Sequence, residues 1–523
     1  MKLKNYALGE WYTSSNTGKV VNHAITGLPI AEVESNGLDF SEMLHYARTQ
    51  GNSALQALTF HQRAKLLKSL GVYLLEQKEL FYTCSIGTGT TRKDAWIDIE
   101  GGIGTLFSYA SQAINSLTDG HILLDGKQEA LSKQGSFVGQ HIYSSITGAA
   151  VHINAYNFPV WGMLEKLAPS IIAGVPVIVK PATQTAFLTE LVAQHIVASG
   201  ILPKGAFQLV CGSLGNMLEH TTYQDVVSFT GSAQTGQMLK ANHNIVSEST
   251  RFMMEADSLN CAILGEDVAT DSADFNLYIR EICNEMTTKA GQKCTAIRRA
   301  IVPQDKLEAV IDAIKLRLGK VVIGHPENPS VTMGALAGLE QRSDVLANIE
   351  RLSESAEVVY GSTDLDSFNV LDGDANKGAF LAPVLMVNQD PGSDLSKQTA
   401  HDIEAFGPVC TLFSYSNTEH ALALAARGKG SLAGSIVTSN YDLAQQLCLG
   451  AAAHHGRLLL LNETCSSEST GHGMVLPQLI HGGPGRAGGS EELGGLRAVK
   501  HYMQRTALQG NPEMLAAILS NTK

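Results

Sequence analysis

The chain has 523 residues, of which 44% are hydrophobic and 17% are charged, and its formal net charge at pH 7 is −12. This length and composition predict a globular protein of two or three packed units and argue against a disordered chain. The acidic balance argues against nucleic acid as a partner. The sequence shows neither an apolar run of about 20 residues, the length that spans a membrane, nor an apolar N-terminal signal segment. A cytoplasmic protein without membrane contact is therefore expected.

The first part of the chain is predicted to be mainly helical. Thr59 and Gln62 have the spacing of a capping box, in which each side chain bonds the other residue's backbone N–H at the start of a helix. A second helix is expected over about 92–112. The buried positions expected are Leu67, Leu70 and Leu74 in the first helix and Trp96, Ile103 and Leu106 in the second.

From Gly148 onward, short apolar runs alternate with helical segments. Strands are expected at 149–153, 175–179, 207–210 and 226–229, and helices at 159–173 and 185–199. This alternation predicts an α/β fold with a doubly wound parallel sheet. Such a sheet binds ligands beyond the carboxyl ends of its strands, which is where Lys180, Gly212 and Thr230 are placed.

A second alternating block runs from about Cys261 to Ile436, with helices expected at 275–290 and 306–318. After a glycine-rich loop, an extended strand is predicted over 501–508. An isolated strand needs an edge to pair with, and a second subunit can supply that edge. A homodimer or a higher homo-oligomer is therefore expected.

The eight cysteines contain no C-x-x-C pair, so reduced thiols are expected, with neither a disulfide framework nor a metal site. They are Cys84, Cys211, Cys261, Cys283, Cys294, Cys410, Cys448 and Cys465. A buried inert thiol is the default for a cysteine. Cys294, in the segment A-G-Q-K-C-T, differs because a cysteine beside small residues at the end of a helix can be a reactive thiolate.

Two further segments carry polar side chains that a cysteine nucleophile requires. Glu255 ends an apolar segment, where a buried carboxylate can act as a general base, although a helix or turn cap is an equal interpretation of this acidic segment. Asn157, in N-A-Y-N-F-P, can aim its amide at a developing oxyanion or form an Asx-turn before a helix.

Three segments suit a nucleotide cofactor, although each by itself can equally be an ordinary loop. Lys180 is at a strand end and suits a ribose or a phosphate. The segment 230–232 opens a helix, whose N-terminal amides suit a pyrophosphate. The third segment is E-A-F-G-P at 404–408. A G-x-G-x-x-G match at 483–488 is set aside, because it is predicted neither to follow a strand nor to open a helix.

In this order, the motifs resemble those of the aldehyde dehydrogenase superfamily over residues 1 to about 509. The shared motifs are N-F-P with Asn157, K-P-A with Lys180, F-T-G-S at 229–232, Glu255, G-Q-x-C at 291–294 and E-x-F-G-P at 404–408. The resemblance implies an α/β fold with a Rossmann-like parallel cofactor domain, an α/β catalytic domain and a β oligomerisation flap. It places the NAD(P)-binding domain at 1–127 and 147–256, the catalytic domain at 257–475, and the oligomerisation segments at 128–146 and 476–523.

The resemblance also implies a role for each matching residue. Cys294 is similar to the nucleophile that attacks the aldehyde, and Asn157 with the Cys294 backbone N–H is similar to the oxyanion hole. Glu255 is similar to the base that activates water to hydrolyse the thioester. Lys180 and Glu404 are implied to hold the two riboses, with Phe406 near the nicotinamide. The full set of implied cofactor contacts is Ile153, Asn154, Ala155, Lys180, Ala182, Thr183, Gly212, Phe229, Thr230, Gly231, Ser232, Glu404 and Phe406.

Two positions depart from the family pattern. The common E-L-G-G-K at the base is replaced by E-A-D-S-L at 255–259, so the loop beside the base differs. The glutamate that often follows K-P-A, and that repels a 2′-phosphate, is replaced by Thr183. Without that repelling charge, NADP is expected as the cofactor, with NAD also accepted.

Three stretches, at 100–107, 254–260 and 481–509, indicate which members of the superfamily the chain resembles most. They are similar to the semialdehyde dehydrogenase part of the ring-opening enzyme of bacterial phenylacetate catabolism and, less closely, to the dehydroadipyl-CoA semialdehyde dehydrogenase of benzoate catabolism. The implied substrate is an aldehyde at the far end of an acyl-CoA, such as oxo-dehydrosuberyl-CoA semialdehyde. The ring-opening enzyme also carries an enoyl-CoA-hydratase-like domain, so either a truncated chain or a separate hydratase-like partner is expected here.

Other interpretations remain open from the sequence. In a CoA-acylating dehydrogenase, CoA would release the thioester, and Glu255 would have no water to activate. A catalytically silent member would serve as a binding or structural subunit, which the presence of Cys294, Asn157 and Glu255 disfavours. Four arginines suit either the CoA phosphates or ordinary salt bridges: Arg298, Arg299, Arg486 and Arg497.

Overall fold

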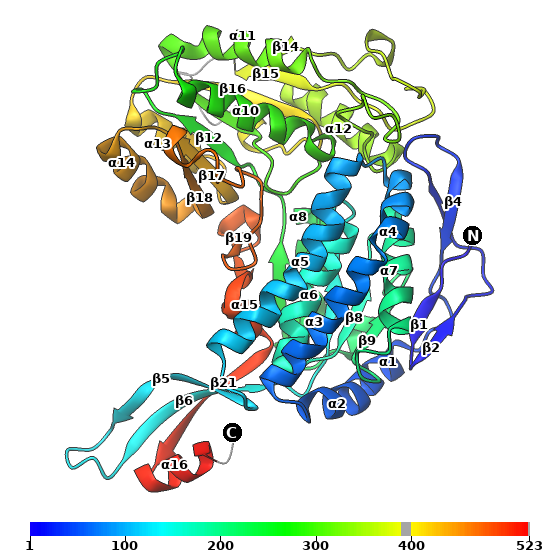
Figure 1. Ribbon diagram of the computed structural model, residues 1–523, viewed down its shortest axis with the longest axis vertical. Coiled ribbons are helices and arrows are strands. Elements are labelled where there is room, and N and C mark those ends of the chain that lie inside the picture. The colour runs from blue at the N-terminus through cyan, green and yellow to red at the C-terminus, as the bar shows by residue number, and fades with distance from the viewer. Residues whose placement is uncertain (389–398, 521–523) are drawn as a thin grey trace.

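The computed structural model describes residues 1–388 and 399–520. Figure 1 shows two large packed units, one above the other, and an arm that projects from the lower unit. Each large unit is built on a seven-stranded sheet, and the arm contains a three-stranded sheet. The mixed α/β architecture predicted from the sequence is therefore confirmed.

The sheet of the lower unit has the strand order β11-β10-β7-β8-β9-β1-β2. Its strands are β1 (Asn5–Ala7), β2 (Glu10–Tyr12), β7 (Ala150–Ile153), β8 (Val177–Lys180), β9 (Phe207–Leu209), β10 (Val226–Thr230) and β11 (Arg251–Glu255). Strands β7 to β11 are parallel, as predicted. Strands β1 and β2 extend the sheet in the antiparallel sense, which the sequence did not indicate.

Helices cover both faces of this sheet. They are α1 (Phe40–Tyr46), α2 (Asn52–Gln56), α3 (Phe60–Glu76), α4 (Lys78–Ser85), α5 (Arg92–Ser116), α6 (Pro159–Ala173), α7 (Ala186–Ala198), α8 (Ala233–Lys240) and α9 (His243–Ser247). Successive side chains of a strand point to opposite faces. Val177 and Val179 therefore pack with α3, α5, α6 and α7, whereas Ile178 packs with α1 and α9. Burial on both faces explains why the strand is apolar throughout.

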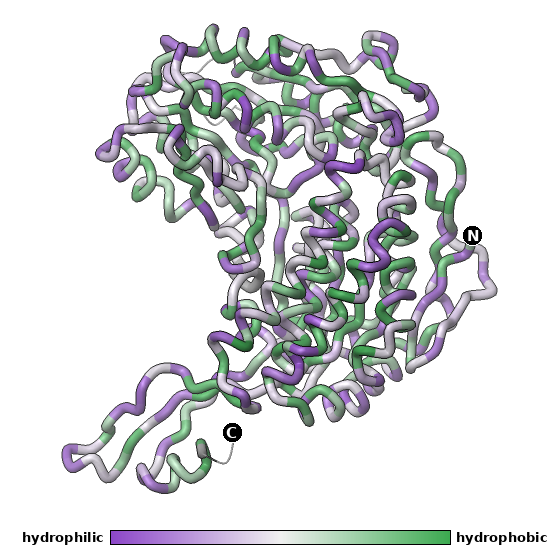
Figure 2. The backbone as a smooth tube through the Cα atoms, viewed as in Figure 1, coloured by the Kyte–Doolittle hydropathy of each residue, from purple (hydrophilic) through white to green (hydrophobic). Residues whose placement is uncertain are grey.

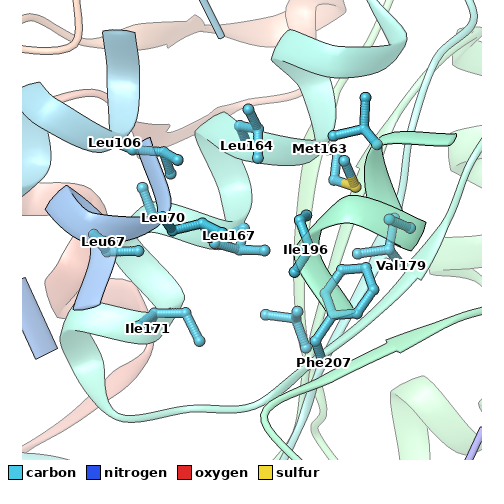
Figure 3. Close-up of a cluster of buried hydrophobic side chains, with 14 of the residues drawn as sticks. Leu67, Leu70, Leu106, Met163, Leu164, Leu167, Ile171, Val179, Ile196 and Phe207 are labelled. Carbon is cyan, nitrogen blue, oxygen red and sulfur yellow. The ribbon is translucent and has the colours of Figure 1, made fainter. Parts of the chain in front are cut away.

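The core between this sheet and its helices consists of interdigitated aliphatic side chains. Figure 3 shows Leu67 and Leu70 of α3 facing Leu167 and Ile171 of α6, with Phe207 of β9 nearby. Each fully buried side chain of this kind contributes about 2 kcal/mol of transfer free energy. Figure 2 shows apolar residues running the length of these helices. The core fixes the sheet whose strand ends carry the candidate site.

The predicted helices of this unit are largely confirmed. Thr59 and Gln62 form the capping box, and α6 has the predicted bounds. The prediction that Trp96 is buried is wrong, since its side chain is 50% exposed. The buried stripe of α5 runs through Ala95, Ile99, Ile103 and Leu106, and Trp96, one helical step of about 100° after Ala95, lies at the margin of that stripe.

The upper unit has the strand order β14-β15-β16-β13-β12-β17-β18 and is parallel apart from the β14–β15 pair. Its strands are β12 (Cys261–Leu264), β13 (Arg299–Pro303), β14 (Ala356–Tyr360), β15 (Val384–Asn388), β16 (Val409–Tyr415), β17 (Ser431–Val437) and β18 (His455–Leu461). Its helices are α10 (Ala273–Thr287), α11 (Leu307–Leu318), α12 (Leu339–Leu352), α13 (Thr418–Ala426) and α14 (Tyr441–Ala451). The second alternating block is thus a second doubly wound sheet.

The arm pairs two distant parts of the chain, in the order β21-β6-β5. Its strands are β5 (Ile122–Ala130), β6 (Val138–Ser145) and β21 (Met503–Gly510). The expectation that the last strand is isolated is wrong, because β21 pairs antiparallel with β6 of the same chain. Before it, the sequence did not predict α15 (Gly495–His501), which packs on α5 and α6. Helix α16 (Pro512–Ser520) follows β21.

Two short hairpins complete the described elements: β3 (Lys19–Asn22) with β4 (Pro29–Val33), and β19 (His481–Gly483) with β20 (Ser490–Leu493). The G-x-G-x-x-G match does follow a strand, β19, contrary to the prediction, but only a single 3-10 turn follows it. All eight cysteines are unpaired. None of the helices in the described residues combines the length and the apolar composition that crossing a membrane requires.

Candidate active site

The carboxyl ends of four neighbouring strands of the lower sheet bring the predicted residues side by side. In register across the sheet, Glu255 pairs with Thr230, and Ile153 pairs with Phe229 on one side and Lys180 on the other. Parallel strands end at the same edge of a sheet, so these residues form one row. The row faces the upper unit, which contributes Cys294.

Cys294 follows α10 in a tight, left-handed reversal of the chain. Lys289, Ala290 and Gly291 have φ values of 55°, 50° and 71°. For the first two residues this conformation is unfavourable, and such backbones persist only where their surroundings hold them. At Gly291 a Cβ atom would clash with the carbonyl oxygen of Gly407, so the G-Q-x-C motif packs directly on the E-x-F-G-P motif. The reversal presents the Cys294 side chain to the lower unit.

Hydrogen bonds hold the segment around Cys294 from several sides. Asn260 Nδ2 donates to the carbonyl oxygens of Cys294, at 2.8 Å, and Ala296, at 2.9 Å. Asn157 Nδ2 donates to the Gln292 carbonyl at 3.0 Å. Among the described residues, none accepts a hydrogen bond from the Cys294 backbone N–H. This N–H and the Asn157 amide are therefore arranged around the same thiol-bearing segment.

Cys294, Glu255 and Asn157 all line one pocket between the two units. Its walls carry apolar groups from α5, α6 and the segment before β19: Ile97, Phe158, Trp161, Met474 and Val475. A half-buried thiol thus lines a pocket with several apolar walls. Such a pocket accommodates a hydrocarbon chain that carries a reactive carbonyl.

Several titratable residues of this pocket were not found from the sequence, among them His481, Glu165 and Lys166. His481 begins β19, and its Nε2 lies 3.1 Å from Glu255 Oε1 and 3.7 Å from Cys294 Sγ. Glu165 and Lys166 lie on α6, where Trp161 Nε1 donates to Glu165 Oε2 at 2.8 Å. In the sequence, these residues appear as two charges in an otherwise apolar helix and as a histidine that opens the H-G-G-P-G segment. Neither pattern indicates a pocket residue until the fold is known.

The charges near Glu255 set the protonation of the site. Burial disfavours a charge on Glu255, but the adjacent His481 outweighs burial and lowers the pKa of Glu255 to about 2. Burial and the Glu255 carboxylate together raise the pKa of the Cys294 thiol well above its ordinary value. At neutral pH, Glu255 is therefore ionised, while the thiol retains its proton unless a neighbouring group accepts it.

The predicted cofactor residues lie beyond this pocket, except for Ala155 and Thr230, which line it. Ile153 and Phe229 belong to the hydrophobic core, so only their backbones are available to a ligand. Gly212 packs against Ser35. Ala182 and Thr183 lie partly exposed after β8, and Gly231 and Ser232 precede α8.

Several of these residues have the unsatisfied polar groups expected of a cofactor site. Both amide atoms of Asn154 are buried, and neither has a hydrogen-bond partner among the described residues. Glu404 is buried 3.6 Å from Arg298, and burial raises its pKa to about 7. Burial lowers the pKa of Lys180. Buried polar atoms without partners are rare, so these groups fit a bound polar molecule such as a dinucleotide.

The N-terminus of α8 was predicted to bind a pyrophosphate, but groups of this chain already accept hydrogen bonds from its backbone N–H groups. The Ser232 hydroxyl caps this helix by accepting from the Thr235 N–H, and the Ala233 N–H donates to the Asp257 carboxylate at 2.8 Å. Asp257 belongs to the loop that departs from the family pattern. An incoming phosphate would have to displace its carboxylate from that N–H.

The two adjacent arginines are not available to a CoA phosphate. Arg298 donates to the carbonyls of Gly291 and Gly407, and Arg299 donates to those of Leu259 and Leu424. Both side chains are buried. Arg486 donates to the Asp402 carbonyl, and Arg497 lies exposed on α15. The suggestion that the pair Arg298–Arg299 meets CoA phosphates is therefore wrong, because Arg298 joins the segments of Gly291 and Gly407, and Arg299 is held by carbonyls in the interior of the upper unit.

Comparisons with known proteins agree with this arrangement. The sequence model of the aldehyde dehydrogenase family matches residues 11–470. The 3,4-dehydroadipyl-CoA semialdehyde dehydrogenase of Aromatoleum evansii is 41% identical over 485 residues, which cover 92% of this chain and 93% of that protein. Protein MaoC of Klebsiella aerogenes is 53% identical over 188 residues, or 36% of this chain and 52% of that protein.

Solved structures share the fold at low sequence identity. A point mutant of betaine aldehyde dehydrogenase from Staphylococcus aureus, in complex with NAD+, has a TM-score of 0.82 at 22% identity and covers 97% of both chains. Lactaldehyde dehydrogenase from Escherichia coli has a TM-score of 0.82 at 20% identity, covering 97% of this chain and 99% of that one. The two-unit architecture with an arm is thus that of these enzymes.

Proposed function

Because the chain belongs to the aldehyde dehydrogenase family, we propose that it oxidises a CoA-linked semialdehyde to the carboxylic acid, with a nicotinamide dinucleotide as the oxidant. The observation that carries this proposal is the convergence of Cys294, Glu255 and Asn157, from both units, on one pocket. The apolar walls of the pocket suit the acyl chain. Glu255 beside the sulfur suits release of the product by water rather than by CoA.

In the proposed reaction, Cys294 Sγ attacks the aldehyde carbon, and the oxyanion that forms accepts from the Asn157 amide and the Cys294 backbone N–H. NAD(P), when bound, accepts the hydride that leaves this carbon. The acyl group then remains on Cys294 as a thioester. Glu255, ionised at neutral pH, takes a proton from the water that attacks the thioester, and the acid is released. Two easier steps replace one difficult step.

The Aromatoleum relative favours one of the two substrates that the sequence suggested. The Aromatoleum protein is a 3,4-dehydroadipyl-CoA semialdehyde dehydrogenase, and its similarity covers nearly the whole chain. It supports 3,4-dehydroadipyl-CoA semialdehyde, the alternative from benzoate catabolism, better than the longer semialdehyde of phenylacetate catabolism. We therefore propose the shorter CoA semialdehyde as the first substrate to test.

Reduction of NADP and NAD by the purified protein, followed by absorbance, tests this substrate class. The panel contains 3,4-dehydroadipyl-CoA semialdehyde, the longer CoA semialdehyde, the corresponding CoA-free semialdehydes and simple aliphatic aldehydes. We expect the CoA esters to exceed the aliphatic aldehydes in kcat/KM by about 100-fold, or about 2.7 kcal/mol of transition-state binding. Equal or better oxidation of aliphatic aldehydes would contradict the substrate proposal.

We propose NADP as the preferred cofactor, held by Lys180 and Glu404 at its riboses. Thr183 stands where related enzymes often carry a glutamate. Thr183→Glu is expected to lower kcat/KM for NADP by about tenfold or more while changing the value for NAD less, because the new carboxylate repels a 2′-phosphate. Gln184→Glu is the matched control, since it adds the same charge one residue along. An unchanged ratio of NADP to NAD use in Thr183→Glu argues against this placement.

We also propose a homodimer or a higher homo-oligomer built through the arm. Leu124, Leu131 and Phe137 lie on the arm and are 55%, 48% and 43% exposed. The arm stands away from the rest of its own chain (Figure 1), so another subunit is the natural cover for these side chains. Light scattering is expected to give at least twice the mass of one chain, and a monomer at micromolar concentration would refute this assembly.

A further inference from the structure

His481 is the one histidine that contacts both the nucleophile and the base of the candidate site within the described residues. Its Nε2 lies 3.1 Å from Glu255 Oε1 and 3.7 Å from Cys294 Sγ. The sulfur, a carboxylate oxygen and an imidazole nitrogen all lie within 4.8 Å of one another. Proton transfer between such groups requires only small movements.

The backbone around His481 leaves it little freedom to turn away. Strand β19 pairs with β20, and the segment between them packs on the end of β11, where the Ala256 N–H donates to the Ala487 carbonyl at 3.1 Å. At Gly488, with φ of 117°, a Cβ atom would clash with the Met254 carbonyl. The His481 side chain is 6% exposed. Close backbone packing thus fixes the imidazole beside Glu255.

The charges facing His481 favour its protonated form. Glu255 of β11 and Glu165 of α6 are the acidic groups near it, whereas Arg457 of β18 opposes them. Lys166, beside Glu255, is a second cation near the site. Burial opposes a charge on the imidazole, but Glu255 outweighs burial and raises the pKa of His481 above its ordinary value. The Glu255 carboxylate therefore stabilises the imidazolium that forms when His481 accepts a proton.

We propose that His481 Nε2 receives the proton of the Cys294 thiol as the sulfur attacks the aldehyde, and that Glu255 stabilises the resulting imidazolium. The S–H bond breaks, an Nε2–H bond forms, and the electron pair left on sulfur attacks the carbonyl carbon. The transfer runs from the molecules in which His481 is neutral and carries its hydrogen on Nδ1, and their share grows as the pH rises through the pKa of His481. This inference rests on the proposed function only in naming Cys294 as the nucleophile.

The arrangement divides the base chemistry between two residues. The negative charge of the Glu255 carboxylate opposes a thiolate on the neighbouring Cys294. The imidazole accepts the thiol proton and offsets the negative charge on the sulfur. Glu255 then remains ionised for the later attack of water. His481 is thus a second proton-accepting residue of the site.

Alkylation of Cys294 by iodoacetamide, measured from pH 5.5 to 10 in the full-length protein, tests the proposal without aldehyde or cofactor. In the wild-type protein the rate is expected to fall as pH falls through the titration of the His481–Glu255 pair. In His481→Gln we expect the rate at pH 7 to drop by about tenfold or more, and the apparent pKa to move upward by about one unit, toward that of a buried thiol without a base. Peptide mass spectrometry confirms that Cys294 is the residue modified.

His243→Gln, an exposed histidine that begins α9, is the matched control and is expected to follow the wild-type profile. His481→Asn is the second variant, and thermal melting and NADP affinity show whether each variant is folded. A His481→Gln or His481→Asn profile that overlays the wild type overturns the proposal. So does a wild-type apparent pKa above about 9, which is that of a thiol with no base within reach. Because no aldehyde is used, these outcomes are independent of the substrate panel.

Discussion

Cys294→Ser is expected to lower kcat/KM for aldehyde oxidation by about four orders of magnitude or more. The serine hydroxyl is far less acidic than the thiol, and the neighbouring Glu255 carboxylate would oppose its ionisation further. Without the sulfur no thioester can form, so the carboxylic acid cannot be released by hydrolysis of a thioester. The change removes one sulfur atom from a segment held by Asn157 and Asn260, so the fold is expected to persist.

The measurement is NADP reduction with the best substrate of the panel, together with NADP affinity and thermal melting. Cys465→Ser is the matched control, because Cys465 is exposed and lies outside the pocket. This control is expected to keep wild-type activity. If Cys294→Ser retained more than about one tenth of the activity while the protein stayed folded, the covalent mechanism would have to be abandoned.

Glu255→Gln is expected to arrest the reaction after the first step. The variant should release about one equivalent of NADPH per active site in a rapid burst and then turn over at least about 1,000-fold more slowly than the wild type. Glutamine cannot take the proton of the attacking water, so the acyl group remains on Cys294. Burial shields this thioester from bulk solvent, and intact-protein mass spectrometry should detect the acyl adduct.

The matched control is Glu248→Gln, which removes an exposed carboxylate at the end of α9 and should leave both phases unchanged. Absence of both burst and adduct in Glu255→Gln would mean that this residue is indispensable before the thioester forms, beyond its stabilisation of the His481 imidazolium. Full steady-state turnover would mean that another group activates the water. Added CoA is expected to leave the stalled adduct in place, whereas rapid release by CoA would favour the acylating alternative.

Local sequence pattern was sufficient for much of the fold. The capping box at Thr59 and Gln62, the bounds of α6 and the parallel strands of the lower sheet follow from contacts between residues close in the chain. A helix depends on neighbours three and four residues apart, and a buried strand needs an unbroken apolar run. The same reasoning placed Lys180 and Thr230 at strand ends, because a parallel sheet aligns those ends.

The order of the motifs along the chain also indicated Cys294, Glu255 and Asn157, and the fold brings these three residues to one pocket. Predictions from local sequence pattern were less accurate for residues whose packing partners are distant in the sequence. They placed Trp96 in the core and left β21 without a partner, whereas the tertiary structure exposes the first and pairs the second with β6. Whether a residue beside the apolar stripe of a helix is buried, and whether the edge of a strand is paired, depends on which distant segments pack against them.

Sequence patterns alone predicted the α/β fold class, the alternating strands and helices from Gly148 onward, and the thiol, carboxylate and amide on which the chemistry is proposed to depend. The folded chain was needed to show that Arg298 and Arg299 donate to backbone carbonyls, and that His481 contacts both Glu255 and Cys294. Secondary structure follows from short-range contacts, whereas the charges around a buried group come from segments that only long-range packing brings together.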